Sequence, residues 1–218
     1  MPEVSSENRR YIPVGFVNKK VIASNLLYTV SNATLYTFGI LASDMHMAWA
    51  RYVCGRLKSD FRYSSGLVYN NYPWPQTPTK EQKAAVEKAA QAVLNVRAQF
   101  MGSAPAPGAV ADALVGNPEG ATTSPRAGKQ SARARTATAG AAVLPKTNST
   151  LADLYDPVAM PPALAKAHAE LDRAVDRCYR KEPFASDRAR VEYLFQLYEQ
   201  LTAPLLPADS KSRRKRIQ

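Results

Sequence analysis

Residues 31–75, SNATLYTFGILASDMHMAWARYVCGRLKSDFRYSSGLVYNNYPWP, contain the patterns that decide the fold class. Apolar residues recur at helical spacing through residues 31–55, and Ser31 or Asn32 is a candidate N-cap. After a polar loop, a short strand is predicted over residues 66–70, and two prolines then prevent any regular element from continuing. A helix that leads into a strand favours a mixed α+β fold. The predicted buried face of the helix comprises Leu35, Phe38, Leu41, Met45, Ala48, Trp49, Tyr52 and Val53.

The residues before this stretch are rich in β-branched and aromatic side chains. Residues 9–18 and 19–30 contain such runs, with proline, glycine and asparagine between them. This pattern predicts two or three short strands. The first region is therefore expected to form a small partial sheet with a packed helix.

Further helices are predicted after residue 76. The stretch TPTKEQKAAVEKAAQAVLNVRAQF (77–100) predicts a helix with Thr79 as N-cap and Gln82 at the capping-box position. Ser149 or Thr150 caps a further turn, Pro161-Pro162 open a helix to about Arg180, and a last helix runs from Ser186 to near Leu201. We expect the last two helices to form an antiparallel hairpin that packs on the helix at 79–100.

A low-complexity segment separates the predicted helices. Residues 102–149 contain no Phe, Tyr, Trp or Ile, and Ala, Gly, Pro, Ser and Thr dominate. Such a composition buries too little apolar area to offset an ordering cost of about 1–2 kcal/mol per residue. We therefore predict a disordered insert within an α-helical C-terminal domain.

Charge is distributed unevenly along the chain of 218 residues. Residues 1–100 carry 12 basic and 6 acidic groups, whereas residues 149–209 carry 7 basic and 10 acidic groups. The N-terminal half is thus the part suited to phosphates. The two cysteines, Cys54 and Cys178, lie far apart, which argues against a zinc site or a disulfide framework. No apolar run approaches the ~20 residues of a membrane span, so a cytoplasmic protein is expected.

The segment Asn71-Tyr72-Pro73-Trp74 is one substitution from the Asn-Pro-Pro-aromatic catalytic loop of DNA amino-methyltransferases. That loop needs S-adenosylmethionine nearby, held by a Gly-rich turn between a strand and a helix. Each glycine before Asn71 is isolated, and Tyr72 stands where the loop has its first proline. We therefore interpret the segment as the exit of a strand, with Tyr72 and Trp74 in the core.

Longer phrases carry a resemblance to a family. NATLYTFGILASDMHMAWARYVCGRLKSDFRYSSGLVYNNYPWP, LADLYDPVAMPPALAKAHAELDRAVDRCY and FASDRARVEYLFQLYEQL resemble the C-terminal portion of MmeI-like DNA methyltransferases, which are fused restriction–modification enzymes. The similarity covers about residues 4–100 and 150–204. The remaining residues have no counterpart in the resemblance.

This resemblance implies a domain organisation and a set of partners. The implied units are the end of a DNA target recognition domain (1–75), the first C-terminal helix (76–100), the disordered insert (101–149), a helical hairpin (150–204) and a disordered basic tail (205–218). The family methylates adenine at N6 with S-adenosylmethionine, and the residues for that chemistry lie upstream of this region. The resemblance thus implies no cofactor in this chain and double-stranded DNA as partner, all in a bacterial cytoplasm. A separately encoded methyltransferase and endonuclease portion is a second candidate partner.

Residues 51–64 concentrate basic and aromatic side chains with Asp60 as the single acid. Arg and Lys in such a loop suit phosphate contacts, and Arg also recognises a guanine edge. The alternative is a solvated basic loop with a weak internal ion pair. With the resemblance, DNA contact is favoured, and the candidate residues are Arg51, Arg56, Lys58, Arg62, Ser64, Arg9, Arg10 and Asn70.

Other polar residues favour structural interpretations. His46 lies between two methionines on an apolar helix, which is more typical of a packed histidine than of a catalytic base. His168 indicates a surface or packing role, and Asn70 at a strand exit is also typical of a turn cap. The tail KSRRKR (211–216) either binds DNA nonspecifically or is a solvated end.

Three hypotheses remain open from the sequence. The first is a DNA-recognition part of an adenine methyltransferase, alone or as an accessory subunit. The second is an enzyme in its own right, which tight S-adenosylmethionine binding would establish. The third is the non-functional remnant of a truncated gene, which a cooperative two-state melt would exclude.

Overall fold

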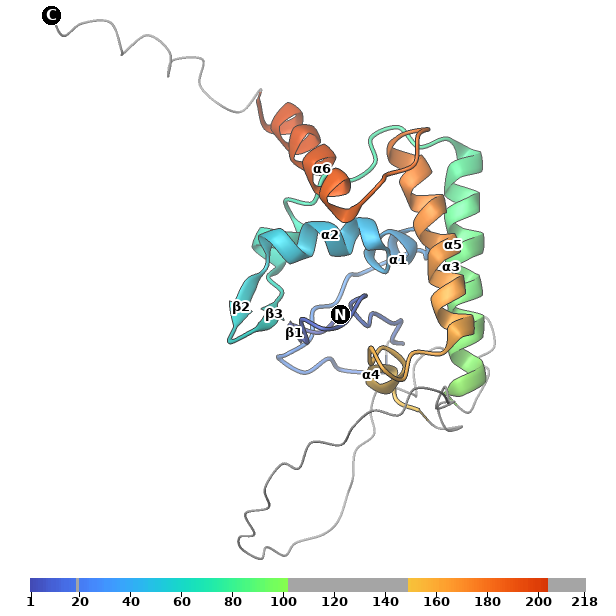
Figure 1. Ribbon diagram of the computed structural model, residues 1–218. Helices are drawn as coiled ribbons and strands as arrows, with labels where there is room; N and C mark the ends of the chain where they lie inside the picture. The colour runs from blue at the N-terminus through green and yellow to red at the C-terminus, as the bar shows by residue number, and fades with distance from the viewer. Residues whose placement is uncertain (19, 102–148, 204–218) are drawn as a thin grey trace, which may run out of the picture.

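The computed structural model describes residues 1–18, 20–101 and 149–203. Except for its end residues, the predicted insert at 101–149 lies outside the described residues, as does the predicted tail at 205–218. Within the described ranges, helices are combined with a three-stranded antiparallel sheet, so the predicted α+β class is confirmed. Figure 1 shows α3 (Lys80–Phe100) and α5 (Pro162–Tyr179) side by side, with α2 (Asp44–Val53) crossing beside them.

The sheet is formed by β1 (Val4–Ser5), β2 (Gly55–Leu57) and β3 (Asp60–Arg62), in the order β1-β3-β2. Val4 lies opposite Arg62, and Gly55 also lies opposite Arg62 from the other side. The strands predicted within residues 9–30 are wrong, since the ladder there is a single bridge from Leu27 to Pro2. Three residues at the start of that stretch, Tyr11, Ile12 and Val14, are buried in the core shared with the helices without pairing in a sheet.

The single helix predicted over residues 31–55 is two helices, α1 (Leu35–Leu41) and α2. Thr34 is the N-cap of α1, instead of Ser31 or Asn32. The break follows from Ser43, whose hydroxyl donates to the carbonyl of Ile40 (2.7 Å) and caps the start of α2. Most of the predicted face is buried, but Tyr52 is 63% exposed.

The strand predicted at residues 66–70 is a π-helical turn, η1 (Ser65–Tyr69). The side-chain amide of Asn71 donates to the carbonyls of Gly66 (2.8 Å) and Leu67 (3.1 Å), which closes this turn. Tyr72 is buried and Trp74 packs against the core, as predicted. The side-chain amide of Asn71 therefore makes its hydrogen bonds within the turn that it follows.

The later helices begin and end close to their predicted bounds. Thr79 and Gln82 form the expected capping box of α3, and Thr150 forms one with Asp153 at α4 (Leu151–Leu154). However, α5 packs along α3, whereas α6 (Asp187–Thr202) packs on α2. The predicted packing of the antiparallel hairpin on α3 is therefore wrong for α6, which lies against α2 with the rings of Phe195 and Tyr198 near that of the buried Trp49 (5.2 and 5.8 Å).

One hydrophobic core joins the two parts of the chain. Buried residues from the extended N-terminal stretch, α1, α2, α3, α4 and α5 belong to the same cluster. Gly39 marks the closest approach, since a Cβ there would lie 2.6 Å from Cγ1 of Val86 on α3. The residues that resemble a recognition domain therefore fold against the C-terminal helices.

Candidate nucleic-acid interface

The β2–β3 hairpin extends from the end of α2, away from α3 and α5 (Figure 1). Its connection is Lys58-Ser59, and Lys58 adopts a left-handed backbone with φ 57°. The Lys58 side chain is exposed at the tip. The hairpin therefore presents a cation at its most distant point from the helical body.

Two arginines are held along the hairpin by local contacts. The Arg56 guanidinium lies over the Phe61 ring (4.1 Å to its centroid) and donates to the carbonyl of Ser59 (3.0 Å). Arg62 donates to Glu3, the residue before β1 (3.0 Å), and stays 59% exposed. Both guanidinium groups are thus oriented and still reach solvent.

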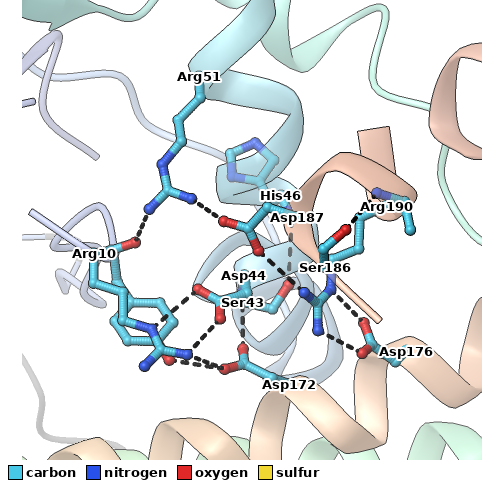
Figure 2. Close-up of polar contacts among 12 residues, drawn as sticks. Arg10, Ser43, Asp44, His46, Arg51, Asp172, Asp176, Ser186, Asp187 and Arg190 are labelled. Carbon is cyan, nitrogen blue, oxygen red and sulfur yellow. Dashed lines mark hydrogen bonds and ion pairs between the residues drawn. The ribbon is translucent and has the colours of Figure 1, made fainter. Parts of the chain in front are cut away.

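Arg51 and Arg10 lie in a different environment. Figure 2 shows Arg51 between Asp187 at the start of α6 and the carbonyl of Arg10. Arg10 is paired with Asp44 (2.7 Å) and lies 4.0 Å from Asp172 on α5. These arginines join the N-terminal part to the C-terminal helices.

The same figure shows that these contacts form a continuous cluster. Arg190 pairs with Asp176 (2.7 Å) and with Asp187 (3.1 Å), and the amide of Asp44 donates to Asp172 (2.8 Å). We call this group the charge cluster: Arg10, Asp44, Arg51, Asp172, Asp176, Asp187 and Arg190.

Burial has shifted the protonation of the charge cluster. Desolvation and the neighbouring Asp44 carboxylate raise the pKa of Asp172 to about 7. The hydroxyl of Tyr11 donates to Asp172 (2.7 Å), and burial together with that carboxylate raises the pKa of Tyr11. The cluster is thus a structural link whose stability depends on pH.

The remaining predicted residues have local roles. Ser64 is the N-cap of η1 and accepts from the amide of Leu67 (3.4 Å). Asn70 is exposed at the end of η1, and Arg9 is half-buried. Their predicted contacts with DNA stay predictions, as do those of the basic residues above.

Sequence reasoning missed a buried polar group in the core. Arg97, 3% exposed on α3, donates to the carbonyl of Val14 (2.6 Å) and to the hydroxyl of Tyr155 (2.7 Å). The Tyr155 hydroxyl in turn contacts Nε2 of His168 (2.6 Å). The signal in the sequence is spacing, because Arg97 lies at helical intervals from Val86, Ala90 and Val93, the other buried residues of α3.

Both histidines are buried. The sequence left a surface role or a packing role open for His168, and the structure shows the packing role. Nε2 of His46 contacts the hydroxyl of Tyr63 (3.0 Å), and burial lowers the pKa of His46 to about 4. Burial also lowers the pKa of His168. Both imidazoles are therefore neutral at physiological pH, which suits packing roles.

Within the described ranges, no three His, Cys, Asp or Glu side chains are grouped to hold a metal ion. Nor does any helix there have the length and apolar character needed to cross a membrane. The side-chain amide of Asn71 is engaged by its own turn, and the described strands have two or three residues each.

Comparisons with known proteins match both parts of the chain. Residues 1–76 match the family model "MmeI, target recognition domain", and residues 129–206 match "MmeI, C-terminal domain". The second match begins inside the segment that sequence analysis predicts as an insert. DNA methyltransferase A of Bacillus subtilis (strain 168) is 37% identical over 202 residues, which are 93% of this chain and 18% of that protein.

A solved structure agrees with these matches. The type IIL restriction–modification enzyme MmeI, solved in complex with DNA, superposes with a TM-score of 0.68 at 36% identity. The match covers 93% of this chain and 21% of the MmeI chain, so this chain spans about a fifth of the length of these relatives.

The fold and the matches define a class: the DNA-recognition and C-terminal region of a restriction–modification enzyme. More particularly, the chain belongs to the MmeI-like family and contains sequence from its target recognition domain and from its C-terminal domain.

Proposed function

We propose that this chain binds double-stranded DNA through the β2–β3 hairpin, as the recognition part of a site-specific DNA adenine-N6 methyltransferase in the bacterial cytoplasm. The observation that carries the proposal is the exposed hairpin with Arg56, Lys58 and Arg62 along it. A two-stranded ribbon fits the major groove of DNA. The match to MmeI in complex with DNA supports the same assignment.

The hairpin combines two kinds of contact. Lys58 at the tip is a mobile point charge that suits a phosphate. Arg56 and Arg62 are oriented by Phe61 and Glu3, and an oriented guanidinium suits bidentate hydrogen bonds to a phosphate or to a guanine edge. We place Arg51, Arg9, Arg10, Ser64 and Asn70 in a second rank of contacts, because carboxylates or local turns already engage several of them.

Methyl transfer would be supplied by the methyltransferase portion of the enzyme, together with S-adenosylmethionine. Extrusion of the target adenine from the duplex is the step that such a portion performs. We propose that this chain does not bind the cofactor itself. Isothermal titration with S-adenosylmethionine tests this point, and a dissociation constant in the micromolar range would refute it.

The DNA-binding proposal is tested with the triple variant Arg56→Ala, Lys58→Ala and Arg62→Ala. Fluorescence anisotropy with a labelled duplex at several salt concentrations should show affinity reduced by about tenfold or more. Loss of three phosphate contacts should also reduce the magnitude of the slope by about 2.7, when the logarithm of the DNA association constant is plotted against the logarithm of the salt concentration. An unchanged affinity and slope would show that the hairpin is not the contact surface.

The matched control removes three exposed lysines elsewhere: Lys88, Lys166 and Lys181. It makes the same change in net charge, so affinity should fall much less than in the hairpin variant. A third variant replaces the basic residues of 211–216 with alanine. If that variant alone abolishes binding, the tail rather than the hairpin carries the affinity, and the proposal fails.

A further inference from the structure

The β2–β3 hairpin, which we call the basic hairpin, begins directly after α2. Helix α2 ends at Val53, Cys54 is its C-cap, and β2 begins at Gly55. The amide of Cys54 donates to the carbonyl of Ala50 (2.9 Å), so the chain passes from helix to strand without an intervening loop. Any change in the direction of the end of α2 therefore changes where the hairpin points (Figure 1).

The backbone of Arg51, in the last turn of α2, is bonded to the hairpin. Its carbonyl accepts a hydrogen bond from Nη2 of Arg56 (3.4 Å), and Nη1 of Arg56 donates to the carbonyl of Ser59 (3.0 Å) in the connection between β2 and β3. One guanidinium thus bridges the last turn of α2 and the tip of the hairpin. The hairpin is therefore expected to move together with the end of α2.

The side chain of Arg51 connects the same turn to α6. Figure 2 shows its guanidinium between Oδ2 of Asp187 (2.5 Å) and the carbonyl of Arg10 (3.3 Å). Asp187 is the first residue of α6, and its other carboxylate oxygen, Oδ1, accepts from Arg190 (3.1 Å). A chain of contacts thus leads from the start of α6 through Arg51 to Arg56 on the hairpin.

The exposure of this pair indicates orientation rather than stability as its role. The side chain of Arg51 is 27% exposed and that of Asp187 is 47% exposed. Solvent screens an ion pair with so exposed a carboxylate, so the pair contributes little to the free energy of unfolding. A guanidinium is planar, however, and two acceptors fix its direction as well as its position. The contact therefore suits the alignment of α2 with α6.

We infer that Asp187 is a positioning residue for DNA binding, which acts through Arg51 to fix the direction of the basic hairpin. The inference rests on the proposed function, and it gives α6 a part in recognition without contact with DNA. A surface that is already held in its binding orientation loses less conformational freedom when DNA binds. Loss of the Asp187 carboxylate should therefore weaken binding.

The test is Asp187→Asn in the full chain, with affinity measured by fluorescence anisotropy on the same labelled duplex. Affinity should fall at least about threefold, although the variant has one more net positive charge. Electrostatic attraction alone predicts the opposite change, which is tighter binding. In the absence of DNA, the amides of β2 and β3 should exchange hydrogen faster, whereas the free energy of unfolding should change little.

Glu192→Gln is the matched control, since Glu192 also lies on α6, is 58% exposed and pairs with Arg188 (2.8 Å). It makes the same change in net charge and should neither weaken binding nor accelerate exchange in the hairpin. Arg51→Met tests the route of the effect. In a chain that carries this substitution, addition of Asp187→Asn should no longer weaken binding, because the effect passes through Arg51.

Three results would overturn the inference and leave the proposed function intact, given a wild type that binds the duplex through the hairpin. They are wild-type affinity or wild-type hairpin exchange in Asp187→Asn, an equal loss of affinity in Glu192→Gln, and a further loss when Asp187→Asn is added to Arg51→Met. A wild type that does not bind the duplex, or a triple hairpin variant that binds as the wild type does, would instead overturn the proposed function, and the inference with it.

Discussion

The basic hairpin and the charge cluster contain the same residue type in opposite settings. On the hairpin, Arg56 and Arg62 are 43% and 59% exposed, and one carboxylate lies near each. In the charge cluster, Arg190 is 12% exposed and its partner Asp176 is 10% exposed. An arginine surrounded by buried carboxylates holds elements together, whereas an exposed arginine remains available for another anion.

The largest effect is expected for Arg190→Ala. This change leaves Asp176 buried without its cation, at a position where α5 and the start of α6 meet. Breaking a buried ion pair by removal of one partner costs about 3 kcal/mol. Urea unfolding of the full chain should therefore show a free energy of unfolding lower by about that amount, with the DNA affinity of the folded protein unchanged.

Arg188→Ala supplies the comparison on the same helix. Arg188 is 84% exposed and pairs with Glu192 one turn further along. An exposed pair at this spacing contributes little to stability because solvent screens it, so Arg188→Ala should lower the free energy of unfolding several-fold less than Arg190→Ala. Equal losses of stability would contradict the distinction between buried and exposed arginines.

The second prediction concerns acid. Burial lowers the pKa of His46 to about 4, so the unfolded chain binds this proton more readily than the folded chain. Stability should therefore fall as pH decreases from about 6.5 to about 4, by about 3 kcal/mol from this group. Asp172 has the opposite sign, because its pKa is raised to about 7 and the folded state binds its proton first. Its ionisation lowers stability above pH 7, and protonation removes that cost as pH falls.

Two variants separate these opposing effects. In Asp172→Asn the stability gained when Asp172 is protonated is absent. The free energy of unfolding should therefore decrease relative to the wild type as pH falls from 7 to 4. In His46→Gln the destabilising protonation of His46 is removed, so the free energy of unfolding should increase relative to the wild type as pH falls from 7 to 4. The measurement is urea unfolding at half-unit pH intervals. Identical slopes in both variants would show that neither group titrates as its burial indicates.

The sequence was most informative where one local interaction decides the structure. The capping boxes at Thr79 and Thr150 and the proline start of α5 are determined by residues within a few positions of one another. Their helices begin where predicted for that reason. The break between α1 and α2 was missed, because the apolar periodicity continues through Ser43 and only its hydrogen bonds show the interruption.

Long-range pairing was the part that the sequence did not indicate. Tyr11, Ile12 and Val14 have the composition of a strand, yet their burial comes from helices far along the chain. Likewise, Arg51 and Arg56 look equivalent in sequence, and only the fold shows that Asp187, more than a hundred residues later, pairs with Arg51. The role of an arginine depends on which carboxylate the fold brings to it.

The smallest expected effect separates charge from conformation at the tip of the hairpin. Lys58 has φ 57°, a conformation that costs an L-residue about 1 kcal/mol and glycine almost nothing. Lys58→Gly and Lys58→Ala remove the same charge, so both should weaken DNA binding about equally. However, the glycine variant should be more stable than the alanine variant by about 0.5 kcal/mol, after the greater entropy of unfolded glycine is included. A glycine variant that binds DNA much more weakly than the alanine variant would show that the rigidity of the hairpin contributes to recognition as well as its charge. The basic hairpin would then share a structural role with the charge cluster.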